Sequence, residues 1–226
     1  MKLVFLDTET TGLPEAEPFL SSPELGPEIT EYAIADWEDG DVTNLEHKLV
    51  YPRNAPEPDA EGICRTLDGF PLSFRPDHWK NEKAVNWNAS DDRTMFARLD
   101  GQLLAGSNPQ FDMNLIKWEC ARNGSRRPTW SHRKLDLNAL GYLLWVQGLV
   151  KSTSLVNLAI YFKVEHEAHT SKGDVLASIA VWEQLHDLFV YRPALMREAL
   201  TDVAECSPDA DMAEMAKRAL NGEALA

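Results

Sequence analysis

An uninterrupted apolar run, Leu3 to Leu6, opens the chain and is followed directly by the acids Asp7 and Glu9. A run of this kind predicts a strand that is buried on both faces of a sheet. Because side chains alternate along a strand, Asp7 and Glu9 share one face and Thr8 points to the other. The chain is therefore expected to place two carboxylates side by side where its first strand ends.

Two neighbouring carboxylates repel each other, and burial adds to the cost, so an ionised pair indicates a cation between them. Taken alone the pair is weak evidence, because 36 of the 226 residues are acidic and such spacings arise by accident. The segment from Thr10 to Pro14 contains glycine and proline and predicts a sharp exit whose backbone N–H groups are open to a ligand.

A second acid, Asp112, follows the same pattern. Residues 103–106 predict a short core strand, residues 107–109 a turn, and residues 111–122 a helix that Gly124 ends. Asp112 then lies in the first turn of this helix. An acid at that position also complements the helix dipole, so the residue by itself does not distinguish a metal ligand from a structural acid.

The third motif combines His169 with Asp174. Thr170 or Ser171 predicts the N-cap of a helix, so Asp174 lies at its start and His169 just before it. The apolar stripe of this helix comprises Val175, Ile179, Trp182 and Leu185. A histidine at a helix entrance can act as a neutral base near pH 7, although a lone histidine is more often an ordinary surface residue.

The order of the motifs is more specific than any one of them. Asp-x-Glu, Asn-x-x-x-Asp and His-x-x-x-x-Asp, in this order, resemble the DnaQ-like family of 3′-to-5′ exonucleases in its histidine-bearing (DEDDh) branch. That family includes the proofreading subunit of bacterial DNA polymerase III and RNase T. The resemblance spans roughly the first 185 residues and includes a helix at 155–162 and a strand at 134–137. It implies an α/β, ribonuclease H-like fold with a mixed five-stranded sheet flanked by helices.

The resemblance also implies the chemistry of the site. The catalytic and metal-binding residues would be Asp7, Glu9, Asp112 and Asp174, with His169 as the general base. Carboxylates are hard oxygen ligands that suit two Mg²⁺ or Mn²⁺ ions. The implied reaction releases nucleoside 5′-monophosphates from the 3′ ends of single-stranded DNA or RNA, and we favour DNA.

Substrate contacts are implied at Thr10, Gly12, Leu13, Asn108 and Phe111, although Leu13 and Phe111 are equally compatible with core positions. The chain departs from many family members at Ser107, where they carry histidine. It departs again at Glu61-Gly62-Ile63, where they carry His-Gly-Ile. Both departures affect how the strand would be bound.

The net charge of −14 opposes broad binding to a phosphate backbone, so any nucleic acid is expected to be gripped locally. The densest basic stretch contains Arg122, Arg126, Arg127, Arg133 and Lys134. This stretch is compatible with contacts to the incoming strand and with an ordinary solvated loop, and the second interpretation is favoured.

The rest of the chain predicts a domain with an extension. Residues 31–37 and 45–51 alternate in polarity and are joined through Asp39-Gly40, which indicates a hairpin. A helix is expected at residues 90–99. The exonuclease domain is expected to cover residues 1–190 and a helical C-terminal extension residues 191–226. Residues 14–27 predict a loop or a flap, and residues 53–89 show no clear pattern.

Composition restricts the remaining alternatives. Cys64, Cys120 and Cys206 are too few and too scattered for a disulfide framework or a zinc motif, and no long apolar segment is present. A cytoplasmic enzyme is therefore expected.

The main alternative is a non-catalytic accessory protein with a nuclease fold, and a metal-dependent phosphatase is a third. A polymerase or clamp is a possible partner, since residues 184–189 weakly resemble a clamp-binding peptide, but they also continue a helical apolar face.

Overall fold

The computed structural model describes residues 1–11, 27–51, 85–86, 89–206 and 210–221. The chain divides into two compact units, Met1–Val181 and Trp182–Ala226. Gly12, Leu13, the Glu61-Gly62-Ile63 segment and nearly all of the patternless stretch lie outside the described residues. The candidate residues that are described all belong to the first unit.

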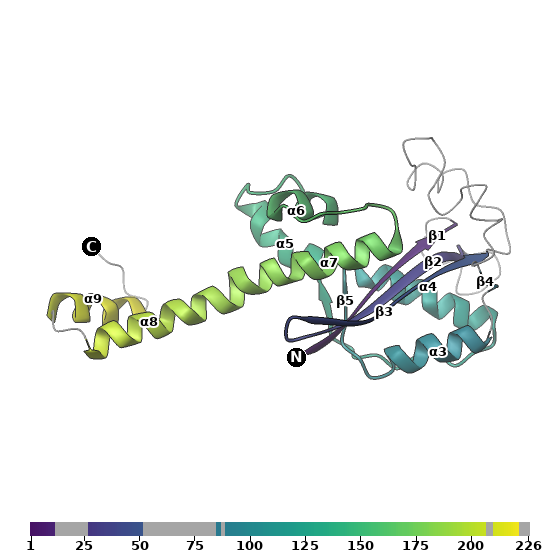
Figure 1. The fold of residues 1–226 in the computed structure, drawn as a ribbon, viewed down its shortest axis with the longest axis horizontal. Helices are drawn as coiled ribbons and strands as arrows, with labels where there is room; N and C mark the ends of the chain where they lie inside the picture. The colour runs from purple at the N-terminus through teal and green to yellow at the C-terminus, as the bar shows by residue number, and fades with distance from the viewer. Residues whose placement is uncertain (12–26, 52–84, 87–88, 207–209, 222–226) are drawn as a thin grey trace. The chain divides into compact units, whose positions relative to one another are not determined.

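The first unit is built on a mixed six-stranded sheet with strand order β4-β3-β2-β1-β5-β6 (Figure 1). The strands are β1 (Lys2–Thr10), β2 (Ile29–Glu38), β3 (Asp41–Tyr51), β4 (Val85–Asn86), β5 (Leu104–Gly106) and β6 (Lys134–Asp136). Strands β1, β2 and β3 pair antiparallel, while β5 runs parallel to β1 and β6 parallel to β5. The five expected strands are present, and the two-residue β4 adds a sixth beside β3.

The hairpin between β2 and β3 turns at the expected position. Asp39 and Gly40 have positive φ angles of 51° and 98°. Two consecutive positive φ values match the right-handed twist of the strands that a two-residue turn connects, and Asp-Gly accepts them readily. The hairpin predicted from the alternating pattern is therefore present.

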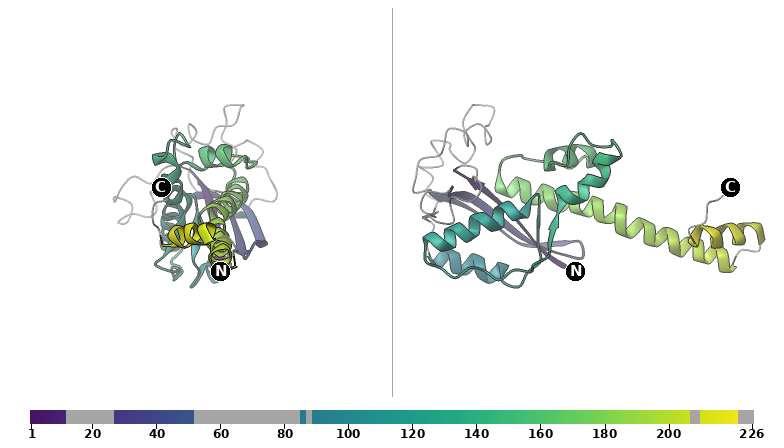
Figure 2. Two further views of the ribbon diagram at one scale, coloured as in Figure 1. Left: turned by 90° about the vertical axis from the view of Figure 1, so that its left-hand side faces the viewer. Right: turned by 180° about the vertical axis from the view of Figure 1, so that it is seen from behind.

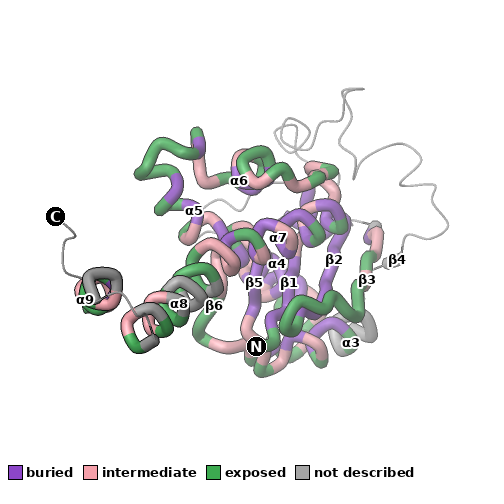
Figure 3. The backbone as a smooth tube through the Cα atoms, turned by 60° about the vertical axis from the view of Figure 1, so that its left-hand side comes forward, coloured by how far each residue is buried: buried purple, intermediate pink, exposed green. Residues whose placement is uncertain are grey.

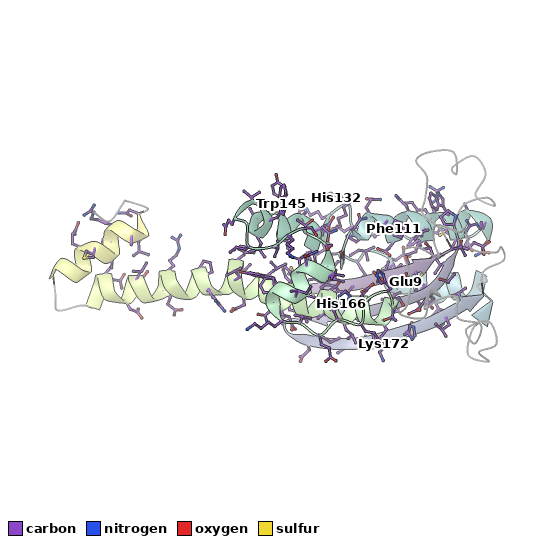
Figure 4. All side chains as sticks on the ribbon, turned by 90° about the horizontal axis from the view of Figure 1, so that it is seen from above. Glu9, Phe111, His132, Trp145, His166 and Lys172 are labelled. Atoms are coloured by element: carbon purple, nitrogen blue, oxygen red, sulfur yellow. The ribbon has the colours of Figure 1, made fainter. Side chains whose placement is uncertain are left out.

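Helices cover both faces of the sheet (Figure 2). They are α3 (Ala89–Leu99), α4 (Pro109–Arg122), α5 (Leu137–Val146), α6 (Leu155–Phe162) and α7 (Ser171–His186). Val4 and Leu6 of β1 pack with side chains of α3 and α4 in the main core cluster. The alternate residues Leu3 and Phe5 are fully buried on the opposite face, and α7 lies on that side of β1 (Figures 3 and 4). Asp7 and Glu9 share this second face, so they face α7.

Helix α5 was not predicted from the sequence. Its segment, LNALGYLLWV, carries apolar residues all around the helix, so no amphipathic period is visible. Leu137 and Leu144 are buried, whereas Tyr142, Leu143 and Trp145 are exposed. From the sequence, only a strand before this segment was predicted. In the structure Asp136 caps α5 by accepting a hydrogen bond from the Asn138 backbone N–H at 3.0 Å.

The second unit is helical. It contains the end of α7, a π-helical turn η4 (Asp187–Tyr191), α8 (Arg192–Cys206) and α9 (Ala210–Leu220). The segment 184–189 is helical and Leu185 is buried, which fits the interpretation as a continued helix face. Among the described residues, no helix combines the length and apolar character needed to cross a bilayer.

Candidate active site

Three carboxylates from the beginning and the end of the first unit's sequence lie together between β1 and α7. Asp7 and Glu9 come from β1 and Asp174 from the first turn of α7, and their carboxylate oxygens lie within 4.8 Å of one another. Glu9 is marked on its strand in Figure 4. A hard divalent cation prefers this set of donors, since all of them are carboxylate oxygens.

Asp112 lies beside this trio but is not a member of it. The Thr8 hydroxyl, on the opposite face of β1 from Asp7, donates a 2.6 Å hydrogen bond to Asp112 Oδ1. Thr8 is 6% exposed and Asp112 3% exposed, so both groups are removed from water. Side chains on both faces of β1 therefore contribute to the site. One face carries Asp7 and Glu9, and on the other face Thr8 orients Asp112 of α4.

Burial and mutual repulsion favour the protonated forms of Asp7 and Asp112 when no cation is present. Burial raises the pKa of Asp7 well above its usual value, and the charges of Asp112, Asp174 and Glu9 raise it further. Burial raises the pKa of Asp112 to about 7 against the opposing hydrogen bond from Thr8, and the charge of Asp174 adds to the rise. A bound cation would reverse these effects by favouring the ionised forms.

We predict that the metal-free protein loses stability as pH rises from about 4 to 8 because of this cluster. A carboxyl whose folded pKa is raised stabilises the fold fully below its unfolded pKa and loses that contribution as pH passes the folded value, about 7 for Asp112. Asp112→Asn should therefore raise the melting temperature in EDTA at pH 8 by about 2 °C or more and have little effect near pH 4. Thermal unfolding across this range tests it, with the exposed Asp41→Asn as control; a gain that is independent of pH would contradict it.

Glu31 ties the start of α7 to the sheet. Its Oε1 accepts hydrogen bonds from the backbone N–H and the hydroxyl of Ser171, both at 2.9 Å, and lies 2.9 Å from His47 Nε2. Burial alone would raise the pKa of Glu31, but the hydrogen bonds from His47 and Ser171 lower it below its usual value. Glu31 is thereby kept ionised, and it holds the helix turn that carries Asp174. Sequence reasoning did not identify this residue, because its partner lies 140 positions away.

Two histidines precede α7, and they occupy different positions. His166 Nε2 contacts Asp174 Oδ1, and its side chain is largely buried (Figure 4). His169 lies in the turn directly before the helix with a positive φ of 63°. Among the described residues the imidazole of His169 has no hydrogen-bond partner, and its residue is partly exposed. Sequence analysis identified His169 and did not identify His166.

The turn that carries His169 is fixed at both ends. Of the two predicted candidates, Thr170 and Ser171, it is Thr170 that caps α7, by accepting a 3.0 Å hydrogen bond from the Gly173 N–H; its own hydroxyl donates to the Glu167 carbonyl at 3.1 Å. Gly173 leaves no room for a side chain. A Cβ there would lie 2.1 Å from the Glu167 carbonyl oxygen and 2.5 Å from Thr170 Oγ1.

We predict that Gly173→Ala destabilises this turn. The added methyl group meets backbone as well as the cap, so the segment from His166 to Thr170 must shift, at a cost of about 1–3 kcal/mol. Chemical denaturation should show the loss of stability. Lys172→Ala is the matched control, because Lys172 is exposed in the same turn. Equal stabilities of the two variants would contradict the tight packing around Gly173.

The implied substrate contacts have different surroundings. Thr10 is buried at the end of β1. Asn108 is exposed just before α4 with φ 59°, and its N–H donates to Asp136 Oδ1 at 3.2 Å. Phe111 is half-buried and packs against the main core cluster, which accords with the core alternative.

The basic stretch divides into parts with different roles. Arg122 is not available to a strand, because it forms a buried ion pair with Glu119 and donates to the Pro27 carbonyl at 2.8 Å. The charge of Arg126 contributes to lowering the pKa of Asp100, after the hydrogen bonds that Thr129 donates to it. Arg127, Arg133 and Lys134 are exposed. The stretch as a whole is therefore not a single solvated loop.

Comparison with known proteins identifies the fold. No family model and no curated protein matches the sequence. Among solved structures, E. coli exonuclease I in complex with a dT13 oligonucleotide is similar, with a TM-score of 0.60, 19% identity, and coverage of 89% of this chain and 44% of that chain. Exonuclease I from Methylocaldum szegediense is similar too, with a TM-score of 0.60 and 18% identity. The match covers 88% of this chain and 43% of that chain.

Exonuclease X in complex with 5′ overhanging duplex DNA is similar over a larger share of its own length, with a TM-score of 0.52, 19% identity, and coverage of 83% of this chain and 92% of that chain. The chain spans less than half the length of the two exonuclease I chains. It shares the fold of these exonucleases, which confirms the predicted α/β, ribonuclease H-like class.

Proposed function

We propose that this chain is a metal-dependent 3′-to-5′ exonuclease of the DnaQ-like DEDDh type that releases nucleoside 5′-monophosphates from single-stranded nucleic acid. The convergence of Asp7, Glu9 and Asp174 within 4.8 Å is the observation that carries this proposal. Asp7 and Glu9 belong to one sequence motif, and Asp174 belongs to another that lies more than 160 positions later. The fold is shared with exonucleases I and X. Carboxylates gathered from such distances need a common ligand, since they otherwise repel each other.

The donor set fits Mg²⁺ or Mn²⁺. The three clustered carboxylates would be ligands and Asp112 beside them a fourth, and two ions are proposed by analogy with the family. When bound, the ions would neutralise the charge of the phosphate and make water a better nucleophile. The protein's own part is to hold these carboxylates in place, which Thr8 does for Asp112 and the contact of Glu31 with Ser171 does for the start of α7.

His169 is proposed as the general base. It stands at the entrance of α7, five residues before Asp174, and its imidazole is not engaged by another described residue. A neutral imidazole at this position would accept the proton of the attacking water. His166 is proposed as a positioning residue, because its contact with Asp174 orients that carboxylate.

Single-stranded DNA is the favoured substrate. Two of the similar structures are complexes with DNA, a dT13 oligonucleotide and a duplex with a 5′ overhang. Thr10 follows Glu9 at the end of β1, and Asn108 and Phe111 lie at the start of α4, which carries Asp112; all three are proposed to contact the terminal nucleotides. A polymerase or clamp as a partner and a cytoplasmic location remain proposals from the sequence.

The function is tested by digesting 5′-labelled single-stranded DNA and RNA of equal sequence, with Mg²⁺ or with EDTA. A Mg²⁺-dependent ladder that shortens from the 3′ end is the expected result, with DNA shortened faster. Chromatography of the products should detect nucleoside 5′-monophosphates. If neither polymer is shortened in Mg²⁺ or Mn²⁺, the free-standing exonuclease is excluded and the accessory protein becomes the better description.

A further inference from the structure

The outer face of α4 carries a polar row that the proposed chemistry does not use. Gln110, Asn114 and Lys117 are spaced four and three residues apart, so they share one face of the helix. Gln110 Nε2 donates to Asn114 Oδ1 at 2.9 Å, and Lys117 Nζ donates to the same oxygen at 3.4 Å. Asp112 is buried on the other side of α4, toward the acids.

Residues from the segment that follows α4 extend this row. Lys134, at the start of β6, donates a 2.7 Å hydrogen bond from Nζ to Gln110 Oε1. Lys117 Nζ lies 5.7 Å from the ring centre of Trp130, which is only partly buried. We call Lys117, Arg127, Trp130 and Lys134 the α4 basic patch. Figure 4 labels Phe111, which belongs to α4, and His132, two residues before Lys134, on one side of the molecule, whereas Lys172 lies on the opposite side.

Arg127 and Lys134 both lie close enough to Lys117 for their charges to act on it. Burial lowers the pKa of Lys117, and the charges of Arg127 and Lys134 lower it further. Within the described parts of the chain, none of the three forms an ion pair with a carboxylate. The chain has 36 acidic and only 22 basic side chains, so unpaired cations gathered at one place are contrary to its average composition. Such a cluster fits an anionic ligand from outside the protein.

The position of the α4 basic patch indicates which anion it binds. Its row begins at Gln110, in the same helical turn as Asp112 and Phe111. It ends at Lys117, seven residues or about 10 Å along the axis. A strand whose 3′ end lies at the acids would pass the first turn of α4 and meet cations for its phosphates and the Trp130 ring for a base.

We propose that the α4 basic patch binds the phosphodiester backbone of the single strand upstream of the nucleotide being removed. The proposal rests on the proposed exonuclease function and adds a second binding site to it. It assigns the patch a role in affinity for strands longer than the terminal nucleotides held at the acids. The ligand chemistry is a row of phosphates, with one base stacked on Trp130.

The test is binding of 5′-fluorescein-labelled dT20 and dT3 in EDTA, followed by anisotropy at several salt concentrations. Arg127→Gln/Lys134→Gln removes two cations of the patch. Lys151→Gln/Lys163→Gln removes two exposed cations elsewhere and is the matched control. The patch variant should bind dT20 about tenfold more weakly, with a salt slope smaller by about 1.4, and should bind dT3 like the control. Circular dichroism melts should show that both variants are folded.

Three results would overturn the proposal. The first is equal loss of dT20 affinity in the patch variant and the control. The second is a (Glu)20 peptide that displaces dT20 from the parent as well as unlabelled dT20 does, which would assign the patch to an acidic protein. The third is no binding of dT20 by the parent. Digestion of dT20 by the parent in Mg²⁺ separates these outcomes, because digestion with equal variants removes the patch proposal and leaves the exonuclease.

Discussion

Replacing Asp7 with asparagine is expected to reduce the Mg²⁺-dependent release of nucleotides from single-stranded DNA by about 10³-fold or more. Loss of a negatively charged metal ligand costs several kcal/mol of transition-state stabilisation. Burial raises the pKa of Asp7 well above its usual value, and the charges of Asp112, Asp174 and Glu9 raise it further. The loss should appear in kcat/KM at saturating Mg²⁺. The exposed Asp41→Asn should retain parental activity.

The same Asp7→Asn variant should be more stable than the parent when metal is absent. Removing one charge from a buried, repelling cluster lowers the cost of folding at pH 8, whereas loss of a structural acid would destabilise the chain. Melting in EDTA at pH 8 therefore separates a site residue from a fold residue. An inactive variant with a lower melting temperature would assign Asp7 to the architecture, and an active variant would remove it from the site.

The two histidines before α7 should have different effects when each is replaced with alanine. His169→Ala is expected to lower kcat by about 10²- to 10⁴-fold, the usual contribution of a general base. His166→Ala is expected to weaken the apparent Mg²⁺ affinity about 10- to 100-fold, because it loses an outer contact to Asp174. Rates measured over a series of Mg²⁺ concentrations give kcat and metal affinity separately. Reversal of these two patterns would exchange the roles of His166 and His169.

The sequence was sufficient for the elements whose pattern is local. The apolar run before Asp7 predicts β1, Asp39-Gly40 predicts the hairpin, and Thr170-Ser171 predicts the start of α7 to within one residue. It was insufficient for α5, whose apolar residues surround the helix, and for β4, which has two residues. In both cases the tertiary environment decides the structure, and no periodic signal precedes it.

The candidate site shows the same division between local and distant information. The order of the motifs along the chain predicts that Asp7, Glu9 and Asp174 belong to one site, and the structure places them together. Their supports could not be predicted in this way. Thr8 reaches Asp112 across 104 positions, and Glu31 reaches Ser171 across 140. No local rule pairs residues at such separations, because the pairing depends on which strands become neighbours.

These long separations also determine when the site can exist during folding. The first and last carboxylates of the trio are contributed by residues 7 and 174, so the trio is complete only after α7 has docked on β1. Contacts across such intervals form late, because closure of a long loop must precede them. A nascent chain that has emerged only as far as β6 would hold Asp7, Glu9 and Asp112 without the helix that completes them. The proposed nuclease activity would thereby be absent until the fold is nearly finished.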